Sequence, residues 1–342
     1  MRKRLTLGFV FLCLAGSTLL PAQTKKVVLN IRSYYFPIGA AELAQLRSAA
    51  PGVQVIAPAE DRLMAEIADA DGLIGNITPE MIRAGKKLKW VQSGSAGVEN
   101  YLTPEMKASP ITLTNCRIVQ GPEVADHAFA LLLALTRELH RIIPTKVKQE
   151  WTPRAYRPIE LRGKTAVVIG VGGIGMQIVL RAHAFGMRVI AVDPRDIPYM
   201  PQIDKSVPPD ALDSVLPEAD VVFVSAPYTR ETHKMIGAKQ FEVMKKGAYF
   251  IAVSRGRLYD AMALIEALRS KRLSGAGLDV MDPEPLTKGH PLWELENVII
   301  TPHIAGRSDG ENARYLALFA ENLRRFSAGL PLLNVVDKEK GY

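Results

Sequence analysis

The stretch of residues 165–195, "TAVVIGVGGIGMQIVLRAHAFGMRVIAVDPR", determines which fold the sequence predicts. An apolar run leads into Gly170, Gly172 and Gly175, whose spacing is G-x-G-x-x-G, and a helical stretch follows. The first glycine permits a tight turn, the second lets a pyrophosphate approach the backbone, and the third brings helix and strand close together. The start of the helix also offers free N–H groups to phosphates. The pattern predicts a strand–helix–strand unit that binds a dinucleotide.

Asp193, at the end of the second apolar run, bears on the choice of dinucleotide. Its carboxylate would accept hydrogen bonds from the adenosine ribose hydroxyls and would repel a 2′-phosphate, which favours NAD(H) over NADP(H). Arg195 lies two residues further along and would weaken this preference. The same glycine spacing occurs in tight turns that bind no ligand. The combination of strand, glycines, helix and acidic residue argues against that alternative.

Short apolar runs alternate with helical stretches on both sides of this unit, which predicts parallel sheets covered on both faces. The strands predicted before the unit are 26–31, 53–57, 72–75, 88–92 and 111–115. Those predicted in the second half are 165–170, 188–193, 221–226, 248–254, 275–280 and 298–303. The first half has no glycine-rich loop, so it is predicted to be an α/β domain without a nucleotide site.

Two helical stretches suggest how the halves are joined. Residues 121–143 read as one long helix that crosses to the second half, and residues 310–329 read as an amphipathic helix that packs back on the first. The predicted fold class is therefore α/β with two doubly wound parallel-sheet domains, in which a Rossmann NAD domain is inserted in a split, flavodoxin-like substrate domain. The predicted domains are 23–119 plus 308–342 for the substrate and 120–307 for NAD.

The first 22 residues carry a secretory pattern. Arg2, Lys3 and Arg4 precede the uncharged, mostly apolar residues 5–20, and Ala22 is small enough to precede a cut. The pattern predicts export to the periplasm or medium. The alternatives are an uncleaved anchor, which would place the protein at a membrane, and a misassigned start of a cytoplasmic protein.

The remaining composition limits the classes of partner. The chain of 342 residues is long for a single core, and its 43 basic and 35 acidic residues give a net charge of +8 without a long basic block. Nucleic-acid binding is therefore not expected. After a cut at Ala22 only Cys116 remains, so that an internal disulfide is excluded.

Arg255, Glu284 and His303 each lie near the end of a predicted strand, where open α/β sheets place their ligands. Taken singly, each is also an ordinary surface or loop residue. Together they form a chemical set: a histidine that exchanges a proton, a carboxylate that favours its charged form, and a guanidinium that holds a carboxylate or carbonyl. Beside a nicotinamide, the set suggests a 2-oxo acid/2-hydroxy acid oxidoreductase. No residues have the spacing of a metal site.

Several blocks, in order, make the chain resemble the D-isomer-specific 2-hydroxyacid dehydrogenase family from end to end. The blocks are "WVQSGSAGVENY", "VADHAFALLLALTREL", "ELRGKTAVVIGVGGIG", "APYTRETHKMIG", "MKKGAYFIAVSRG", "GLDVMDPEPL" and "LENVIITPHIAG". The family has a split substrate domain with an inserted NAD domain, and it is typically dimeric through its nucleotide domains. The resemblance therefore implies a homodimer that acts on a small 2-oxo or D-2-hydroxy acid, similar to glyoxylate or hydroxypyruvate or larger.

The resemblance also implies residue roles. Arg255 binds and orients the substrate, Glu284 tunes the histidine, and His303 donates the proton in reduction. The backbone N–H groups of Ala96 and Gly97 hold the substrate carboxylate. Including the glycine loop, the implied cofactor contacts are Gly170, Gly172, Gly173, Ile174, Gly175, Asp193, Pro227, Thr232, Val253, Ser254, Arg255, Asp279 and His303. Among these, Asp279 is implied to hold the nicotinamide amide.

Three departures from the family pattern leave this set intact. Ala252 stands where asparagine is frequent, Ser225 where histidine is common, and Asp126 where glutamate is usual. Glu284 argues against the formate dehydrogenase branch, which usually carries glutamine there. Two alternatives stay open: oxidation of another small anion, as in phosphite dehydrogenases, and an NAD(H)-sensing binding protein on the same scaffold.

Overall fold

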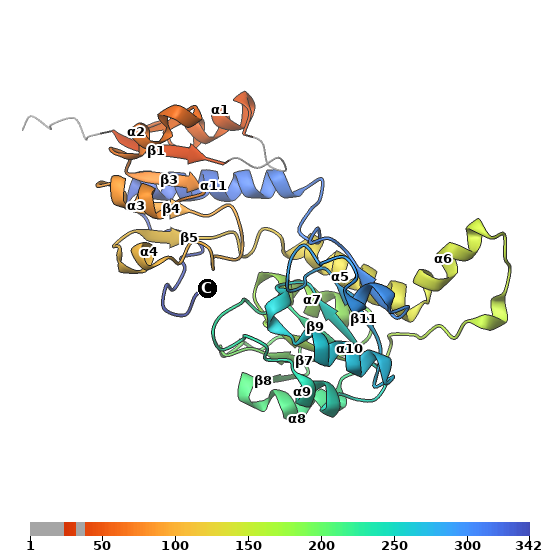
Figure 1. Cartoon of the computed structure of the whole chain (residues 1–342). Helices are drawn as coiled ribbons and strands as arrows, with labels where there is room; N and C mark the ends of the chain where they lie inside the picture. The colour runs from red at the N-terminus through yellow and green to blue at the C-terminus, as the bar shows by residue number, and fades with distance from the viewer. Residues whose placement is uncertain (1–23, 32–37) are drawn as a thin grey trace, which may run out of the picture.

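The structure is a computed structural model that describes residues 24–31 and 38–342. The predicted signal segment, residues 1–22, lies outside the described residues. The described chain forms two lobes, each built on a parallel sheet (Figure 1). This arrangement confirms the predicted fold class.

The first lobe is built on a parallel sheet with the strand order β2-β1-β3-β4-β5. Its strands are β1 (Lys25–Asn30), β2 (Val53–Ile56), β3 (Gly72–Gly75), β4 (Trp90–Gln92) and β5 (Thr112–Thr114). Its helices before the crossing are α1 (Ala40–Ala49), α2 (Leu63–Ile67), α3 (Pro79–Ala84) and α4 (Pro104–Ala108), with a 3₁₀ turn η1 (Glu60–Arg62). The sequence Thr-Pro-Glu-Met starts both α3 and α4, and in each case the threonine side chain accepts a hydrogen bond from the methionine amide.

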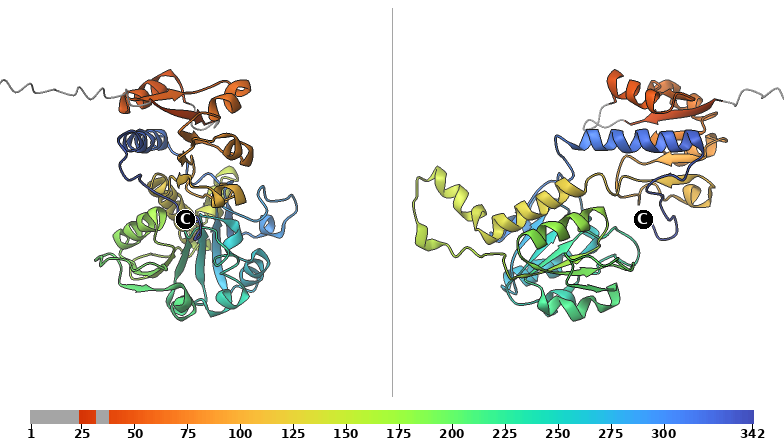
Figure 2. Two further views of the ribbon diagram at one scale, coloured as in Figure 1. Left: turned by 90° about the vertical axis from the view of Figure 1, so that its left-hand side faces the viewer. Right: turned by 180° about the vertical axis from the view of Figure 1, so that it is seen from behind.

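The helix α11 (Glu311–Ala328) returns to this lobe from the far end of the chain. Its residues Phe319 and Leu323 share one buried cluster with Val27 and Leu29 of β1 and with Trp90 of β4. Figures 1 and 2 show the helix lying along the sheet. The expected packing of residues 310–329 on the first lobe is confirmed, whereas the domain limits at 119/120 and 307/308 stay predictions.

The second lobe is built on a larger parallel sheet, in the order β12-β11-β10-β9-β6-β7-β8. Its strands are β6 (Thr165–Ile169), β7 (Arg188–Val192), β8 (Lys205–Val207), β9 (Val221–Val224), β10 (Ala248–Ala252), β11 (Leu273–Leu278) and β12 (Val298–Ile300). Val167 and Ile169 of β6 point into one apolar cluster and Ala166 and Val168 into another, because successive side chains of a strand face opposite sides. The edge strand β8 was not predicted, since its three residues have no apolar run.

Helices cover this second sheet. They are α5 (Gly121–Thr136), α7 (Gly173–Ala184), α8 (Leu212–Val215), α9 (Ala238–Val243) and α10 (Ala261–Arg269). The 3₁₀ turns are η2 (Pro153–Ala155), η3 (Pro209–Ala211), η4 (Leu216–Glu218), η5 (Gly256–Leu258) and η6 (Pro291–Glu294). The helical stretch predicted after the glycine loop corresponds to α7.

The predicted single helix over 121–143 is wrong. It breaks after α5, because Glu138 adopts a left-handed conformation with φ 56°. The Glu138 side chain accepts a hydrogen bond from the Arg157 amide, at 3.0 Å, which ties the break to the connector that follows. A separate helix, α6 (Leu139–Val147), then points away from the second lobe. Figures 1 and 2 show that residues 138–158, here called the arm, project from the body of the molecule.

The chain crosses between the lobes twice, at residues 115–120 and 305–310, and the two crossings lie side by side. The Gln120 side chain donates a hydrogen bond to the Gly306 carbonyl at 3.2 Å. Arg314 donates to the Val119 carbonyl at 2.9 Å and to Glu123 at 2.7 Å. Within residues 24–31 and 38–342, no helix is both long and apolar enough to cross a membrane.

Candidate active site

A cleft of about 1350 Å³ lies between the lobes, at the carboxyl ends of strands from both sheets. Open α/β sheets bind ligands at this edge. The volume exceeds the roughly 300–1,000 Å³ of a typical small-molecule pocket, so that a dinucleotide and a small acid fit together. Of the predicted site residues, Gly175 and Glu284 do not line the cleft; those that line it are Ala96, Gly97, Gly170, Gly172, Gly173, Ile174, Asp193, Pro227, Thr232, Val253, Ser254, Arg255, Asp279 and His303.

The glycine loop joins β6 to α7, and close packing explains three of its glycines. Gly170 has φ 85°, and a Cβ added there would lie 2.4 Å from the Ala226 backbone. A Cβ on Gly173 would lie 2.2 Å from the Arg117 carbonyl oxygen, and one on Gly175 would lie 1.9 Å from the Gly170 carbonyl oxygen. A side chain at any of these positions would push strand, helix and crossing apart.

Gly172 differs from the other glycines of the loop. A Cβ added there would meet no atom of the described chain within 4 Å, although the residue lines the cleft. It is the N-cap of α7, so the first amides of a 12-residue helix start at the same point. Open space beside free amides and a positive helix end fits a pyrophosphate. Gly172, Gly173 and Ile174 would hold that group.

Asp193 is buried at the end of β7 and is paired with Arg195. Its two oxygens accept hydrogen bonds from the Arg195 Nε and Nη2, at 2.8 and 3.0 Å, and from the amides of Arg195 and Val171. Burial alone would raise the pKa of Asp193, but these hydrogen bonds lower it below its ordinary value. The carboxylate is therefore charged at neutral pH, and Arg195 neutralises it.

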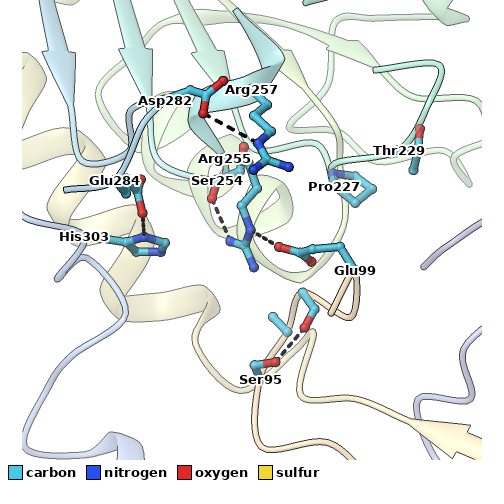
Figure 3. Close-up of polar contacts among 12 residues, drawn as sticks. Ser95, Glu99, Pro227, Thr229, Ser254, Arg255, Arg257, Asp282, Glu284 and His303 are labelled. Carbon is cyan, nitrogen blue, oxygen red and sulfur yellow. Dashed lines mark hydrogen bonds and ion pairs between the residues drawn. The ribbon is translucent and has the colours of Figure 1, made fainter. Parts of the chain in front are cut away.

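His303 and Glu284 form the predicted pair. The His303 Nδ1 lies 2.7 Å from the Glu284 Oε2 (Figure 3). The other Glu284 oxygen accepts a hydrogen bond from the Met281 amide at 2.8 Å. Burial would raise the pKa of Glu284, but the bonds from His303 and Met281 lower it. Since His303 lines the cleft and Glu284 does not, the carboxylate stands behind the imidazole as its support.

Asp279 holds the loop that carries His303. Its carboxylate accepts hydrogen bonds from the Thr301 hydroxyl at 2.6 Å and from the amides of Ile304 and Ala305 at 3.0 and 2.9 Å. Its carbonyl accepts one from the His303 amide at 2.9 Å. These bonds stabilise His303 at φ 52°, which is uncommon for a residue with a side chain. The implied contact of Asp279 with nicotinamide stays a prediction.

His127 extends this network and was not predicted from the sequence. Its Nε2 lies 2.8 Å from the Thr301 hydroxyl and 3.5 Å from the Asp279 carboxylate. The residue lies on α5, in the block "VADHAFALLLALTREL", and no motif in the sequence gave it a role.

Arg255 reaches from the second lobe to the first, where it meets Glu99. Its Nε donates to the Glu99 carboxylate at 2.5 Å, and its Nη1 donates to the Ser254 carbonyl at 2.7 Å (Figure 3). Its Nη2 lies so close to Gly97 that a Cβ there would be 1.9 Å away. The guanidinium therefore touches the loop that is predicted to hold the substrate carboxylate. Sequence reasoning missed Glu99, because nothing local links it to a residue 156 positions away.

The other predicted cofactor contacts shape the walls of the cleft. The Thr232 hydroxyl donates to the Pro227 carbonyl at 2.8 Å and accepts from the Thr229 amide at 2.8 Å, which closes the loop after β9. The Ser254 hydroxyl donates to the Val224 carbonyl at 3.2 Å. Among the described residues, no three histidine, cysteine or acidic side chains lie together in a way that could hold a metal ion.

Comparisons with known proteins agree with this geometry. Residues 129–305 match the model of the D-isomer specific 2-hydroxyacid dehydrogenase, NAD binding domain. A glyoxylate reductase of Korarchaeum cryptofilum is 34% identical over 291 residues, which cover 82% of this chain and 87% of that protein. A D-3-phosphoglycerate dehydrogenase of Archaeoglobus fulgidus is 34% identical over 261 residues, 76% of this chain and 49% of that longer protein.

A solved structure is similar over almost the whole chain. It is a D-isomer specific 2-hydroxyacid dehydrogenase from Xanthobacter autotrophicus in complex with NADPH and MES, with a TM-score of 0.79 and 27% identity over 93% of this chain and all of that one. Fold and site together define a nicotinamide-dependent oxidoreductase. The chain belongs to the D-isomer specific 2-hydroxyacid dehydrogenase family.

Proposed function

We propose that this protein interconverts a small 2-oxo acid and the corresponding D-2-hydroxy acid, with NAD(H) as its preferred cofactor. The observation that carries the proposal is that His303, supported by Glu284, lines the same cleft as Arg255 and the glycine loop. A proton donor, an anion-binding guanidinium and a dinucleotide site are the parts that the reaction needs.

The chain's own residues would work as follows in reduction. Arg255, with the amides of Ala96 and Gly97, would hold the substrate carboxylate and carbonyl. His303 would donate a proton from its imidazole to the carbonyl oxygen, and Glu284 would stabilise the charged imidazole before that transfer. When bound, a reduced nicotinamide supplies the hydride. In the oxidation of a hydroxy acid, His303 would accept the proton instead.

Glyoxylate and hydroxypyruvate are the proposed substrate types, with larger 2-oxo acids next. The glyoxylate reductase named above supports the class. The Glu99 carboxylate next to Arg255 supports a monoanionic substrate, since a second negative charge on the substrate would be repelled at short range.

The cofactor preference rests on Asp193 and is moderated by Arg195. The buried carboxylate of Asp193 lines the cleft at the end of β7, where it would accept hydrogen bonds from the ribose hydroxyls of NAD(H). Arg195 pairs with both of its oxygens and offers a positive charge to a 2′-phosphate, and the Xanthobacter relative was solved with NADPH. We therefore propose that NADH is preferred and NADPH is accepted.

The test is NADH and NADPH oxidation by purified protein with glyoxylate, hydroxypyruvate, pyruvate and phenylpyruvate. The expected result is turnover of at least one acid, with a higher kcat/KM for NADH than for NADPH. Turnover of none of these acids together with tight NADH binding would instead favour an NAD(H)-sensing protein. Oxidation of phosphite by NAD⁺ would point to the small-anion alternative.

Glu284→Gln tests the support of His303 through the pH profile. The variant should reduce the 2-oxo acid more slowly, and the pH at which its rate falls to half the maximum should be lower, because the amide no longer stabilises the protonated imidazole. The measurement is kcat from pH 5 to 9. An unchanged profile would contradict the role, and Glu296→Gln, outside the cleft lining, is the matched control.

The Glu284 carboxylate should also make the stability of the folded protein depend on pH. The pKa of Glu284 is lowered from 4.5 in the folded protein, so its contribution to stability is present above that pH. The contribution is lost as the pH falls through the folded-state value. Glu284→Gln should therefore have a lower Tm than the parent protein at neutral pH, and this difference in Tm should shrink toward pH 3.

We also propose a homodimer that uses the arm. Its side chains Ile143, Val147 and Trp151 are 64, 86 and 92% exposed, which is unusual for apolar residues that extend from one lobe. Light scattering should give twice the mass of one chain, which is 37.5 kDa for all 342 residues and less after a cut at Ala22. Val147→Asp should shift the measured mass toward that of a single chain, because it places a charge in the apolar contact. Met262→Asp on α10 is the control and should leave the mass unchanged. A monomeric parent protein would end the proposal.

Export through residues 1–22 is a proposal that rests on the charge and hydropathy pattern alone. A mature N-terminus at Gln23 in an extracytoplasmic fraction would support it. A chain that starts at Met1 in the cytosol would contradict it, and a chain that starts at Met1 in the membrane fraction would support the anchor.

A further inference from the structure

The segment Asp337–Tyr342 is attached to the first lobe. It nevertheless lines the cleft together with residues of the second lobe. Its residues Glu339, Lys340, Gly341 and Tyr342 form part of the cleft wall. They were assigned no role by the motifs, which end at Gly306. Figures 1 and 2 show this end of the chain, marked C, between the two lobes.

The preceding residues attach the segment firmly to the first lobe. Val335 pairs antiparallel with Thr114 of β5, and the Val336 amide donates to the Leu113 carbonyl at 2.8 Å. The Lys338 ammonium donates to the carbonyls of Met106 and Ser109, at 2.9 and 2.8 Å, at the end of α4. The backbone pairing with β5 and the hydrogen bonds of the Lys338 ammonium fix the position of the segment on the first lobe.

The segment itself is a closed turn. The Asp337 carboxylate accepts hydrogen bonds from the amides of Glu339 and Lys340, both at 3.0 Å. The Gly341 amide donates to the Asp337 carbonyl at 2.8 Å, and Gly341 has φ 85°, which favours glycine. The turn therefore presents Tyr342 in a defined position, half-buried against the cleft.

The turn contacts both lobes at the adenosine end of the cleft. A Cβ on Gly341 would lie 3.7 Å from Thr229, on the loop after β9, and 3.8 Å from Leu102 of the first lobe. Tyr342 lines the same cleft as Asp193 and Arg195, the carboxylate–guanidinium pair that follows β7, where the adenosine ribose is expected.

We propose that the segment Asp337–Tyr342 is part of the dinucleotide site, in which the ring of Tyr342 covers the adenosine half of the cofactor. A phenol ring offers a purine an apolar face to stack on. The ring would lose little conformational freedom on binding, because the turn already orders it. The first lobe would then hold the cofactor at its adenosine end as well as the substrate at the other. This inference rests on the proposed dinucleotide binding.

The test compares Tyr342→Ala with the parent protein by calorimetry on three ligands. NADH and ADP-ribose, which both carry adenosine, should bind about tenfold more weakly to the variant, since aromatic stacking on a base typically has this weight. Reduced nicotinamide mononucleotide lacks adenosine, so its Kd should be unchanged. Tyr342→Phe should restore binding, and Trp293→Ala, an exposed aromatic outside the cleft lining, is the matched control.

A protein that lacks residues 339–342 gives a second measurement, because deletion removes the turn without placing a new side chain in the cleft. It should show the same loss for NADH and ADP-ribose. Equal Kd values for NADH in parent and variants, tighter binding after deletion, or an equal loss for the mononucleotide would overturn the inference. If the parent binds neither NADH nor ADP-ribose, the proposed function fails with it.

Discussion

His303→Ala should lower kcat for 2-oxo acid reduction by about 10²–10⁴-fold, the usual contribution of a positioned general acid. The imidazole is the proposed proton donor; it lines the cleft, and its Nδ1 lies 2.7 Å from the Glu284 carboxylate. NADH affinity should stay within about twofold of the parent, because the glycine loop and Asp193 are unchanged. Stopped-flow rates and calorimetric Kd values separate the two effects.

His183→Ala is the matched control, since His183 is an exposed residue on α7. It should keep full activity. Retention of more than about a tenth of the parent kcat in His303→Ala would show that another group donates the proton. An equal loss of NADH affinity would indicate a damaged cofactor site.

Arg255→Ala should lower kcat/KM by about 10²–10³-fold, because the two or more charge-assisted hydrogen bonds that we propose Arg255 makes to the substrate would be lost. Arg255→Lys should recover little, since an ammonium cannot reproduce the planar fork that reaches Glu99, Ser254 and the Gly97 loop together. The loss should appear mainly in KM if the arginine holds the substrate before the reaction. It should appear equally in kcat if the contact forms only in the transition state.

Glu99→Gln provides the comparison for this result. The variant removes the charge that pairs with Arg255 at 2.5 Å but keeps the shape of the side chain. It should change kcat/KM far less than Arg255→Ala. It should also improve acceptance of a dianionic 2-oxo acid such as oxaloacetate relative to glyoxylate, because the repulsion at that point is gone. An equal collapse in both variants would mean that Glu99 itself is needed to orient the guanidinium.

Much of the fold could be predicted from local patterns. Parallel strands that are buried on both faces read as continuous apolar runs, such as residues 165–170, and these were identified along the chain. The glycine loop was readable because the tight turn and the close helix packing leave room only for glycine at Gly170 and Gly175. Glu138 shows the limit of this reasoning: its left-handed backbone breaks a helix within an uninterrupted helical sequence.

The parts of the site that were missed depend on contacts between distant residues. Glu99 meets Arg255 only because the two lobes face each other, and His127 reaches Asp279 through Thr301 from another element. Tyr342 enters the cleft because Val335 pairs with β5. None of these pairings leaves a periodic or local signal, so only the folded chain reveals them.

The two neighbouring crossings between the lobes have a mechanical consequence. The two segments are joined by the Gln120–Gly306 hydrogen bond and by Arg314, so we expect any change in the gap between the lobes to be a rotation about that line. Glu99 and Arg255 sit on opposite sides of the gap that such a rotation opens and closes. An incoming anion that replaces Glu99 on Arg255 would therefore substitute its own contacts for the ion pair that joins the two lobes. Product release would then require the contacts between that anion and Arg255 to break.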